Sequence, residues 1–404
     1  MLQVRFYCLA RCKRVWGTGS VLRLLAAGLV ATALVACEKA PSLDLIPSQV
    51  GVEPGPEYSV ALDSSRAVTR RALGRMYLPG VSVAVGQAGE ILWSEGFGWS
   101  DLSRKTPSTP LSLYPAGSIS KSMTSVAVGV LYDRGLIDLD APVQKYLTEF
   151  PEKEKGTITT RQLMGHISGL QNYGITKALR QGHCTDLRDG VPMMQDDTLF
   201  WEPGHRYRYS NFGFRLVGAI VRVAADEPYL DVMQREVFDA MGMGHTVPDT
   251  IYQSGPGIST PYNQRSFATL RRSQPVDMSC SMAEGGFLST PQDLVRFGFA
   301  MLAHEVMEEG TRDLLWTSLE LNNGAPTGYG LGWSTSPRRL GREERATQTV
   351  GHGGSTLGGR ASLLIIPETG MVVATMTNSR GGNVRMSQLS GYIASFFRSP
   401  EGSQ

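Results

Sequence analysis

Hydrophobic and polar positions follow similar patterns at the two ends of the chain. Residues 60–76 have a mostly helical pattern, and two short apolar runs come next, separated by a turn at 88–90. The far end has apolar runs at 361–366 and 371–376, followed by a helical pattern over 385–397. These patterns predict a hairpin and a helix at each end. They favour one antiparallel sheet assembled from both ends, with helices packed on its faces.

The middle of the chain, roughly 115–310, has a mainly helical pattern interrupted by long loops. Its two strongest apolar helical stretches cover 118–136 and 212–225. The stretches 176–200 and 250–277 are polar and rich in Gly and Pro, so we expect irregular loops that wall a substrate site. The predicted fold class is therefore α/β (α+β), with the antiparallel sheet joined to a second, mainly helical lobe.

The N-terminal segment has the pattern of an export signal. Arg23 precedes an almost unbroken stretch of apolar and small residues, 24–36, which is too short to span a bilayer. Residues 34–37 read Leu-Val-Ala-Cys and resemble a bacterial lipobox, in which Cys37 would be diacylated and become the mature N-terminus. A plain signal peptide with a chance cysteine is one alternative, and a mitochondrial transit peptide is another.

These observations divide the chain into four parts. We predict a signal peptide (1–36), a proline-rich tether (37–59), a folded domain (60–398) and a short tail (399–404). A lipid anchor would hold the mature protein on a membrane without crossing it, facing the periplasm. The outer membrane is favoured because Glu38, rather than Asp, follows the cysteine. A mitochondrial or soluble secreted protein remains the alternative.

Composition and charge remove several classes of protein. The 404 residues are 41% apolar and 19% charged, which is typical of a globular protein and not of a disordered or collagen-like one. The net charge is +2, and the first 36 residues hold five basic residues and no acidic one, so the remainder is slightly acidic. Nothing here favours a nucleic-acid partner. Cys184 and Cys280 lie in the predicted folded part, where they could pair in an oxidising compartment or remain buried thiols.

Two short motifs contain side chains suited to nucleophilic catalysis. Ser118 and Lys121 form an S-x-x-K motif, which places the hydroxyl and the amine on one face of a helix. Burial would lower the pKa of the amine enough for it to act as a base. Tyr209 and Asn211 supply a phenol and an amide on either side of a serine. Each motif also has a simpler interpretation, a helix-capping serine beside a surface lysine and a tyrosine beside a helix cap.

A third motif follows a predicted strand and contains a titratable ring beside small residues. Its members are His352, Gly353, Gly354 and Ser355. Glycine has no Cβ, so the backbone here can be approached closely, although a simple glycine turn would have the same composition. No metal is expected, because no C-x-x-C or H-E-x-x-H spacing occurs. The G-x-S-x-G elbow of another serine hydrolase fold is also absent from the sequence.

The three motifs in this order resemble those of the serine β-lactamase and penicillin-binding-protein superfamily. The branch concerned contains class C β-lactamases, D-alanyl-D-alanine peptidases and β-lactamase-fold esterases. Segments at 163–170, 285–294 and 329–333 support the resemblance, which covers roughly 60–398. Residues 118–173 are similar to the mitochondrial serine β-lactamase-like branch. The resemblance implies a β-lactamase/transpeptidase-like fold and a serine hydrolase without a cofactor.

The resemblance also implies a role for each motif residue. Ser118 would be the acylated nucleophile and Lys121 its activating base. Tyr209 would carry the proton to the leaving group and then help activate the deacylating water, while Asn211 would orient the substrate or Lys121. The family's third motif begins with Lys or His, and this chain contains no lysine after Lys177.

Histidine in the third motif changes the expected substrate. His352 is mostly neutral at pH 7, so its hold on a β-lactam carboxylate is weaker than that of a lysine, and Arg360 is the expected replacement. The backbone N–H groups of Ser118 and Ser355 would form the oxyanion hole. We therefore expect an ester or peptide bond in a small molecule or peptide as substrate. A true class C-like β-lactamase or D-alanyl-D-alanine carboxypeptidase is the alternative, and a non-catalytic scaffold is a second one. His166 is expected to be structural, and the oligomeric state is left open.

Overall fold

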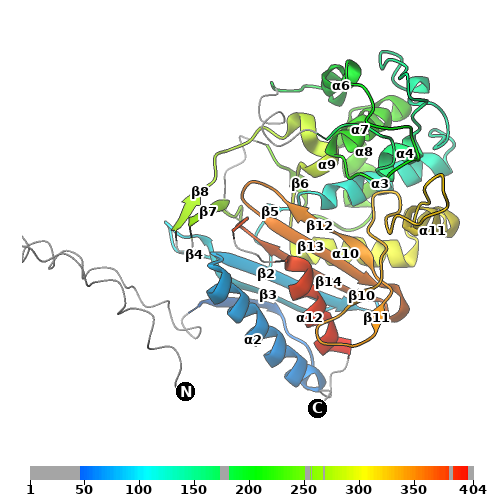
Figure 1. Cartoon of the computed structure of the whole chain (residues 1–404). Coiled ribbons are helices and arrows are strands. Elements are labelled where there is room, and N and C mark those ends of the chain that lie inside the picture. Colours follow the sequence, from blue (N-terminus) through cyan, green and yellow to red (C-terminus); the bar gives the residue numbers. More distant parts are fainter. Residues whose placement is uncertain are drawn as a thin grey trace, which may run out of the picture. The chain divides into compact units, whose positions relative to one another are not determined.

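The computed structural model describes most of the chain (Figure 1). The described residues are 46–398 except 173–181, 251–254, 256, 267–268 and 382–384. The predicted signal peptide, Cys37 and the predicted tail lie outside the described residues. Leu43–Gln404 forms one compact unit, separate from Met1–Ser42.

The main sheet contains strands from both ends of the chain, as the sequence predicts. Its antiparallel order is β1 (Ser48–Val52), β3 (Glu90–Asp101), β2 (Gly80–Gln87), β14 (Met371–Thr377), β13 (Arg360–Ile366) and β12 (Val350–Ser355), with β4 (Thr106–Pro107) paired to β3. The two ends of the chain meet at the centre of the sheet, where Val85 on β2 lies opposite Val373 on β14. The β2–β3 turn has φ values of 52° at Ala88 and 87° at Gly89, which suit the twist of a tight hairpin.

Helices cover both faces of this sheet (Figure 1). On one face, α2 (Ser59–Met76) and α12 (Met386–Arg398) pack against each other and share an apolar core with the strands. Within that core, the rings of Trp93 and Phe397 stack with their centroids 6.0 Å apart. On the other face, α10 (Pro291–Ala303) contacts β2 and β14.

The second lobe is built around α3 (Ile119–Asp133), whose residues 119–131 are all buried. The surrounding helices are α4 (Thr160–Met164), α6 (Pro192–Gln195), α7 (Asn211–Ala225), α8 (Tyr229–Met233), α9 (Met282–Gly285) and α11 (Glu309–Trp316). Short helical turns are η2 (Pro56–Tyr58), η3 (Val143–Lys145), η4 (Leu187–Gly190), η5 (Gln234–Asp239), η6 (Ser279–Ser281) and η7 (Pro367–Thr369). Minor strands are β5 (Tyr114–Pro115), β6 (Val247–Pro248), β7 (Tyr262–Ser266), β8 (Thr269–Arg272), β9 (Phe287–Ser289), β10 (Arg338–Arg339) and β11 (Ala346–Thr347).

Three local expectations differ from the structure. Residues 48–52 of the predicted tether form β1, whose pairing with β3 makes them part of the sheet. The stretch 250–277 is not irregular throughout, because β7 and β8 form a hairpin within it. The third motif lies inside β12 rather than in a turn after a strand, because residues 350–355 pair along their length with β13.

Two further features concern the cysteines and the helices. Cys184 and Cys280 form a disulfide, with a Cα–Cα distance of 5.0 Å, which decides between the two alternatives left open by the sequence. Within the described residues, no helix is both long and apolar enough to cross a membrane.

Candidate active site

Ser118 and Lys121 lie at the N-terminal end of α3, one helical turn apart. Ser118 immediately precedes the helix, but its hydroxyl makes no capping hydrogen bond. Its side chain is partly exposed, whereas Lys121 is fully buried. Lys121 Nζ lies 3.3 Å from Ser118 Oγ. The proximity that the S-x-x-K spacing predicts is present, and the interpretation as a capping serine beside a surface lysine is wrong.

Three oxygen atoms surround the Lys121 amine. Besides its contact with Ser118, Nζ donates to Asn211 Oδ1 at 2.8 Å and to the main-chain oxygen of Glu284 at 2.7 Å. Burial lowers the pKa of Lys121 to about 7, and the Glu284 carboxylate opposes this shift. A large fraction of molecules therefore carries a neutral amine at neutral pH, which is the form that can accept a proton.

A buried ion pair lies behind Lys121 and was not predicted. The Arg215 guanidinium donates to Glu284 Oε1 at 2.6 Å and to Ser281 Oγ at 2.7 Å, and the Arg215 side chain is inaccessible to solvent. The pair fixes the segment whose Glu284 carbonyl accepts a hydrogen bond from Lys121. The sequence does contain a signal for this pair. Arg215 is a basic residue inside the strongly apolar helix α7, and a buried charge requires a partner.

Tyr209 places its ring beside Lys121. Lys121 Nζ lies 5.0 Å from the centroid of the Tyr209 ring. The Tyr209 hydroxyl is buried and makes no hydrogen bond of ordinary geometry with the described residues. Burial raises the pKa of Tyr209, and the nearby Ser118 hydroxyl opposes this shift. Tyr209 therefore remains a protonated phenol at neutral pH, with its hydroxyl available to a substrate.

His166 packs directly against the second motif. Its ring lies 4.2 Å from the Tyr209 ring between centroids, and its Nδ1 accepts a hydrogen bond from the backbone N–H of Ser210 at 3.3 Å. Burial lowers the pKa of His166 well below its usual value, so the ring is neutral. Because Ser210 lies between Tyr209 and Asn211, this contact positions both side chains. The structural role expected of His166 would therefore be to hold the Ser210 backbone in place.

His352 makes hydrogen bonds through both ring nitrogens. Nε2 lies 2.8 Å from the Tyr329 hydroxyl, and Nδ1 lies 2.8 Å from the carbonyl oxygen of Gly353. A carbonyl can only accept, so Nδ1 carries the proton and Nε2 accepts from Tyr329. Burial lowers the pKa of His352 to about 3, and the nearby charge of Lys121 lowers it further. The ring is therefore neutral at pH 7, and Tyr329 is a site residue that sequence motifs did not single out.

Two glycines let the edge strand β12 approach the start of α3. A Cβ built on Gly354 would lie 1.9 Å from the carbonyl oxygen of Ala116, and one on Gly117 would lie 2.7 Å from the backbone nitrogen of Ser355. Gly117 also has a φ of 54°, which favours glycine. By contrast, a Cβ on Gly353 would meet nothing within 4 Å. Close approach therefore requires glycine at 117 and 354 but not at 353.

The edge of β12 that faces away from β13 presents backbone groups near this site. Both backbone hydrogen-bonding groups of Gly351 pair with Ser334, which lies away from β13. Successive residues of a strand alternate their N–H groups between the two sides, so Gly353 and Ser355 also direct theirs to this edge. At the start of α3, the N–H groups of residues 119–121 donate to the carbonyl oxygens of residues 116–118, whereas the N–H of Ser118 makes no hydrogen bond to any described residue. The edge strand and the helix start thus offer backbone donors on the same side of the sheet.

Arg360 lies beside the same strand. It lines a small cavity of about 250 Å³ together with Gly353, Gly354 and Ser355. Burial lowers the pKa of Arg360, and Arg380 adds a smaller effect of the same sign. Four of the predicted substrate-binding residues thus share this cavity, whose lining also includes Arg385, Met386 and Ser387 near the start of α12 but not His352, Ser118 or Lys121. Among the described residues, no three His, Cys, Asp or Glu side chains are grouped to hold a metal ion.

The sheet, the helical lobe and the three motifs at their junction define a class of proteins. It is the class of β-lactamase-like and penicillin-binding-protein-like serine hydrolases. The family model described as Beta-lactamase matches residues 66–396, and the chain belongs to this family.

Named relatives and solved structures agree with this family. The human protein named "Serine beta-lactamase-like protein LACTB, mitochondrial" is 29% identical over 405 residues, covering 77% of this chain and 73% of that protein. "Penicillin-binding protein 4*" of Bacillus subtilis is 25% identical over 276 residues, covering 65% and 60% of the two chains. An octameric penicillin-binding protein homologue from Pyrococcus abyssi has the same fold, with a TM-score of 0.73 at 22% identity, covering 84% and 78%. A D-amino acid amidase from Ochrobactrum anthropi, in complex with L-phenylalanine amide, gives 0.72 at 22% identity, covering 85% and 100%.

Proposed function

We propose that this protein is a serine hydrolase that cleaves ester or amide bonds through an acyl-enzyme on Ser118. The observation that carries the proposal is the buried Lys121 amine, whose pKa is lowered to about 7 and whose Nζ lies 3.3 Å from Ser118 Oγ. A lysine placed only for structure would more commonly keep its charged group in water. The neutral amine is the activating base that a serine nucleophile requires.

The surroundings of Lys121 orient its lone pair. A neutral amine has two N–H donors, and two fixed oxygen acceptors are available to them, Asn211 Oδ1 and the Glu284 carbonyl. With both donors used, the lone pair is directed to the remaining neighbour, Ser118 Oγ. In this arrangement Asn211 acts as a positioning residue for Lys121.

The reaction then proceeds in two balanced stages. Lys121 accepts the Ser118 proton as Oγ attacks the carbonyl carbon, and the backbone N–H groups of Ser118 and Ser355 stabilise the oxyanion. Tyr209 donates its proton to the departing alcohol or amine and regains one from Lys121. Water then attacks the acyl carbon and gives one proton to the neutral Lys121, directly or by relay through the Tyr209 hydroxyl, and Lys121 returns a proton to Ser118 Oγ as the bond between the acyl carbon and Oγ breaks. The acid is released and the enzyme is restored.

Esters and peptide-like amides are proposed ahead of β-lactam drugs. His352 is neutral and both of its ring nitrogens are already hydrogen-bonded, so it supplies no cation to a drug carboxylate. Arg360, beside the cavity at Gly353, Gly354 and Ser355, is the cation proposed to contact an acidic group of the substrate. The D-amino acid amidase that has the same fold is named for amide hydrolysis, and this supports an amide bond as a substrate here.

Labelling by a fluorophosphonate probe tests the nucleophile. We expect the wild type to be labelled at Ser118 and Ser118→Ala to be unlabelled and inactive. Ser120→Ala is the matched control, because Ser120 is on the same helix, buried, and its hydroxyl has no hydrogen-bond partner among the described residues. Equal labelling of wild type and Ser118→Ala, or no labelling of folded wild type, would overturn the proposal.

The substrate preference is tested by comparing two substrates on the same enzyme sample. Hydrolysis of nitrocefin as fast as a short-chain p-nitrophenyl ester would overturn the preference for esters and amides.

We also propose that the protein is a periplasmic lipoprotein anchored through Cys37. The Cys184–Cys280 disulfide supports an oxidising compartment. The names of the mitochondrial relatives support the alternative location. Wild type and Cys37→Ser should be expressed in a bacterium and fractionated, with mass spectrometry of the N-terminal peptide. Membrane association of the wild type alone, with a diacylated Cys37, is the expected result. An unmodified Cys37, or identical soluble fractions, would contradict the anchor.

A further inference from the structure

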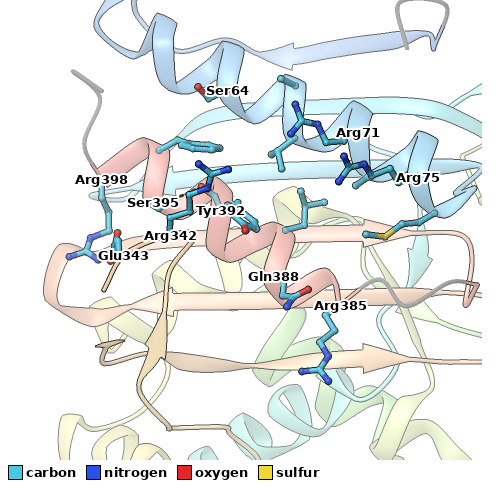
Figure 2. Close-up of a pocket in the computed structure, with 16 residues that line it drawn as sticks. Ser64, Arg71, Arg75, Arg342, Glu343, Arg385, Gln388, Tyr392, Ser395 and Arg398 are labelled. Carbon is cyan, nitrogen blue, oxygen red and sulfur yellow. Dashed lines mark hydrogen bonds and ion pairs between the residues drawn. The ribbon is translucent and has the colours of Figure 1, made fainter. Parts of the chain in front are cut away.

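A broad groove lies on the sheet face that carries α2 and α12. Its volume is about 1040 Å³, and residues of both helices and of the loop at 342–343 line it. Figure 2 shows the Arg71 and Arg75 side chains extending from α2 into the space beside α12. Ser118, Lys121 and Tyr209 are not among its lining residues, and Arg385 is the one described residue that lines both this groove and the small cavity at Gly353, Gly354 and Ser355.

Positive charge dominates the groove. Its arginines are Arg71, Arg75, Arg342, Arg385 and Arg398, and its acidic lining residue is Glu343. Glu343 is already paired with Arg398 at 3.2 Å. The side chains of the other four arginines make no ion pair or hydrogen bond to any of the described residues. The groove therefore has an excess of cations that nothing in the described fold neutralises.

Apolar side chains lie between these cations. They include Val68 and Met76 from α2 and Leu389 and Phe396 from α12. Guanidinium groups bind phosphate through paired N–H donors, and apolar surface favours hydrocarbon. A ligand that matches both the arginines and the apolar side chains is an anionic amphiphile, which combines a phosphate group with a hydrocarbon chain.

The stretch of chain that joins this face to the proposed anchor is short. On α2, next to Arg71, the Arg70 guanidinium donates to the Ile46 carbonyl at 2.7 Å and to Ser48 Oγ at 2.9 Å. Ile46 is thereby held against the helix that forms one wall of the groove. Between Cys37 and Ile46 the chain can span at most about 30 Å. A lipid on Cys37 would keep this wall within that distance of the bilayer.

We propose that the arginine groove between α2 and α12 binds the phosphate headgroups of anionic phospholipids in the membrane. The headgroup phosphates contact Arg71 and Arg75, and the acyl region lies along the apolar residues between the helices. This rests on the proposed lipoprotein location for its setting in the cell. An acidic peptide also carries anions, but it lacks the contiguous hydrocarbon that the lining of the groove accommodates.

Vesicle sedimentation tests phospholipid binding by the groove independently of the lipid anchor at Cys37 and of the hydrolase activity. The compact unit that starts at Leu43 lacks Cys37, and it is mixed with phosphatidylcholine vesicles containing about 30% phosphatidylglycerol or none. We expect binding to the anionic vesicles only, reduced about tenfold in Arg71→Gln/Arg75→Gln and lost in about 0.5 M salt. The matched control is Arg271→Gln/Arg272→Gln, which removes two exposed arginines from β8 and is expected to bind like the wild type.

Three results would overturn the proposal. These are equal binding to both kinds of vesicle, equal losses in the two double variants, or capture of a poly-glutamate peptide by the groove without vesicle binding. The last result would identify an acidic-peptide site instead. Ester hydrolysis measured on the same samples reports on Ser118 separately, so failure of membrane binding and failure of the proposed hydrolase are distinguished. Arg71 and Arg75 are exposed, and neither is placed in the catalytic machinery.

Discussion

The charge of Lys121 sets the pH dependence expected of the reaction. Only the neutral amine can accept the Ser118 proton, and the pKa of Lys121 is lowered to about 7 by burial. We expect kcat/KM for an ester to rise with pH through a single ionisation near pH 7 and then to level off. His352, with a pKa of about 3, does not titrate in this range. A rate profile from about pH 5 to about pH 9 measures this, and a flat profile would contradict the role of Lys121.

The contact between His166 and Ser210 predicts different kcat values for two substitutions at position 166. His166→Leu leaves the buried N–H of Ser210 without an acceptor, at a cost of about 1–3 kcal/mol, and frees the neighbouring Tyr209 to move. His166→Asn keeps a side-chain acceptor and tolerates the φ of 60° at this position. We expect kcat to fall about tenfold or more in the leucine variant, with partial recovery in the asparagine variant. Equal kcat values in the two folded variants would show that the hydrogen bond has no positioning role.

At single positions, the sequence predicted the residues of the three motifs but missed the partners that other segments bring to them. Ser118 and Lys121 are three residues apart, so the helix alone explains their proximity. Glu284 meets Lys121 across a separation of 163 residues, and Tyr329 meets His352 from another loop. Such contacts depend on tertiary packing, which no local spacing encodes.

At the scale of elements, the position of β12 against α3 depends on Gly354 far more than on Gly353. A Cβ at position 354 would lie 1.9 Å from the Ala116 oxygen, so Gly354→Ala must push the strand away from the start of α3. The backbone donors of Ser118 and Ser355 would then lose their shared target. We expect kcat to fall at least about 100-fold, the loss typical of a missing oxyanion donor.

Gly353→Ala is the control for this substitution. Its Cβ meets nothing within 4 Å, so the strand should keep its place. Circular dichroism and ester kinetics on both variants make the comparison. Equal kcat values in Gly354→Ala and Gly353→Ala would show that the close approach of β12 does not align the site.

Helices and hairpins were predictable where their pattern is local. α2 and α12 lie within one residue of the ranges predicted from periodicity, and the β2–β3 turn lies where it was predicted, although β3 continues to Asp101, well beyond its predicted apolar run. The strand β12 was not recognised, because the glycines at 351, 353 and 354 have low strand propensity and only pairing with β13 holds them extended. The β7–β8 hairpin was missed for a related reason, since its polar residues show no apolar alternation.

For the whole molecule, the disulfide predicts sensitivity to reduction. Cys184 and Cys280 are 96 residues apart, and the cross-link joins the segment preceding η4 to η6 beside the Glu284 segment. We expect Cys184→Ser/Cys280→Ser to lower the free energy of unfolding by about 2–4 kcal/mol. Urea unfolding with and without a thiol reductant measures this. Reductant should lower the wild-type value to that of the variant and leave the variant unchanged, whereas an unaffected wild type would contradict the bond's contribution.

The overall architecture was predictable because both ends of the chain carry a hairpin and a helix. A two-stranded hairpin is only marginally stable alone, so the hairpins of the two ends stabilise each other by pairing in one sheet, whose two faces helices then cover. The predicted joint sheet is confirmed by the β2–β14 pairing. The placement of the helical lobe against the sheet was not predictable, because the approach of α3 to β12 depends on glycines that no periodic pattern marks.

The β2–β14 pairing also constrains when the protein can fold. Gln87 is made early in synthesis, yet its partner across the sheet is Met371, and α12 must follow to cover that face. While the ribosome is still translating the helical lobe, the strands β1 to β3 have no central neighbour. The complete sheet therefore cannot form until the chain is almost fully synthesised. For the same reason, a premature stop codon before β14 removes the middle of the sheet as well as the last few elements, so late truncations should behave as complete losses of the protein.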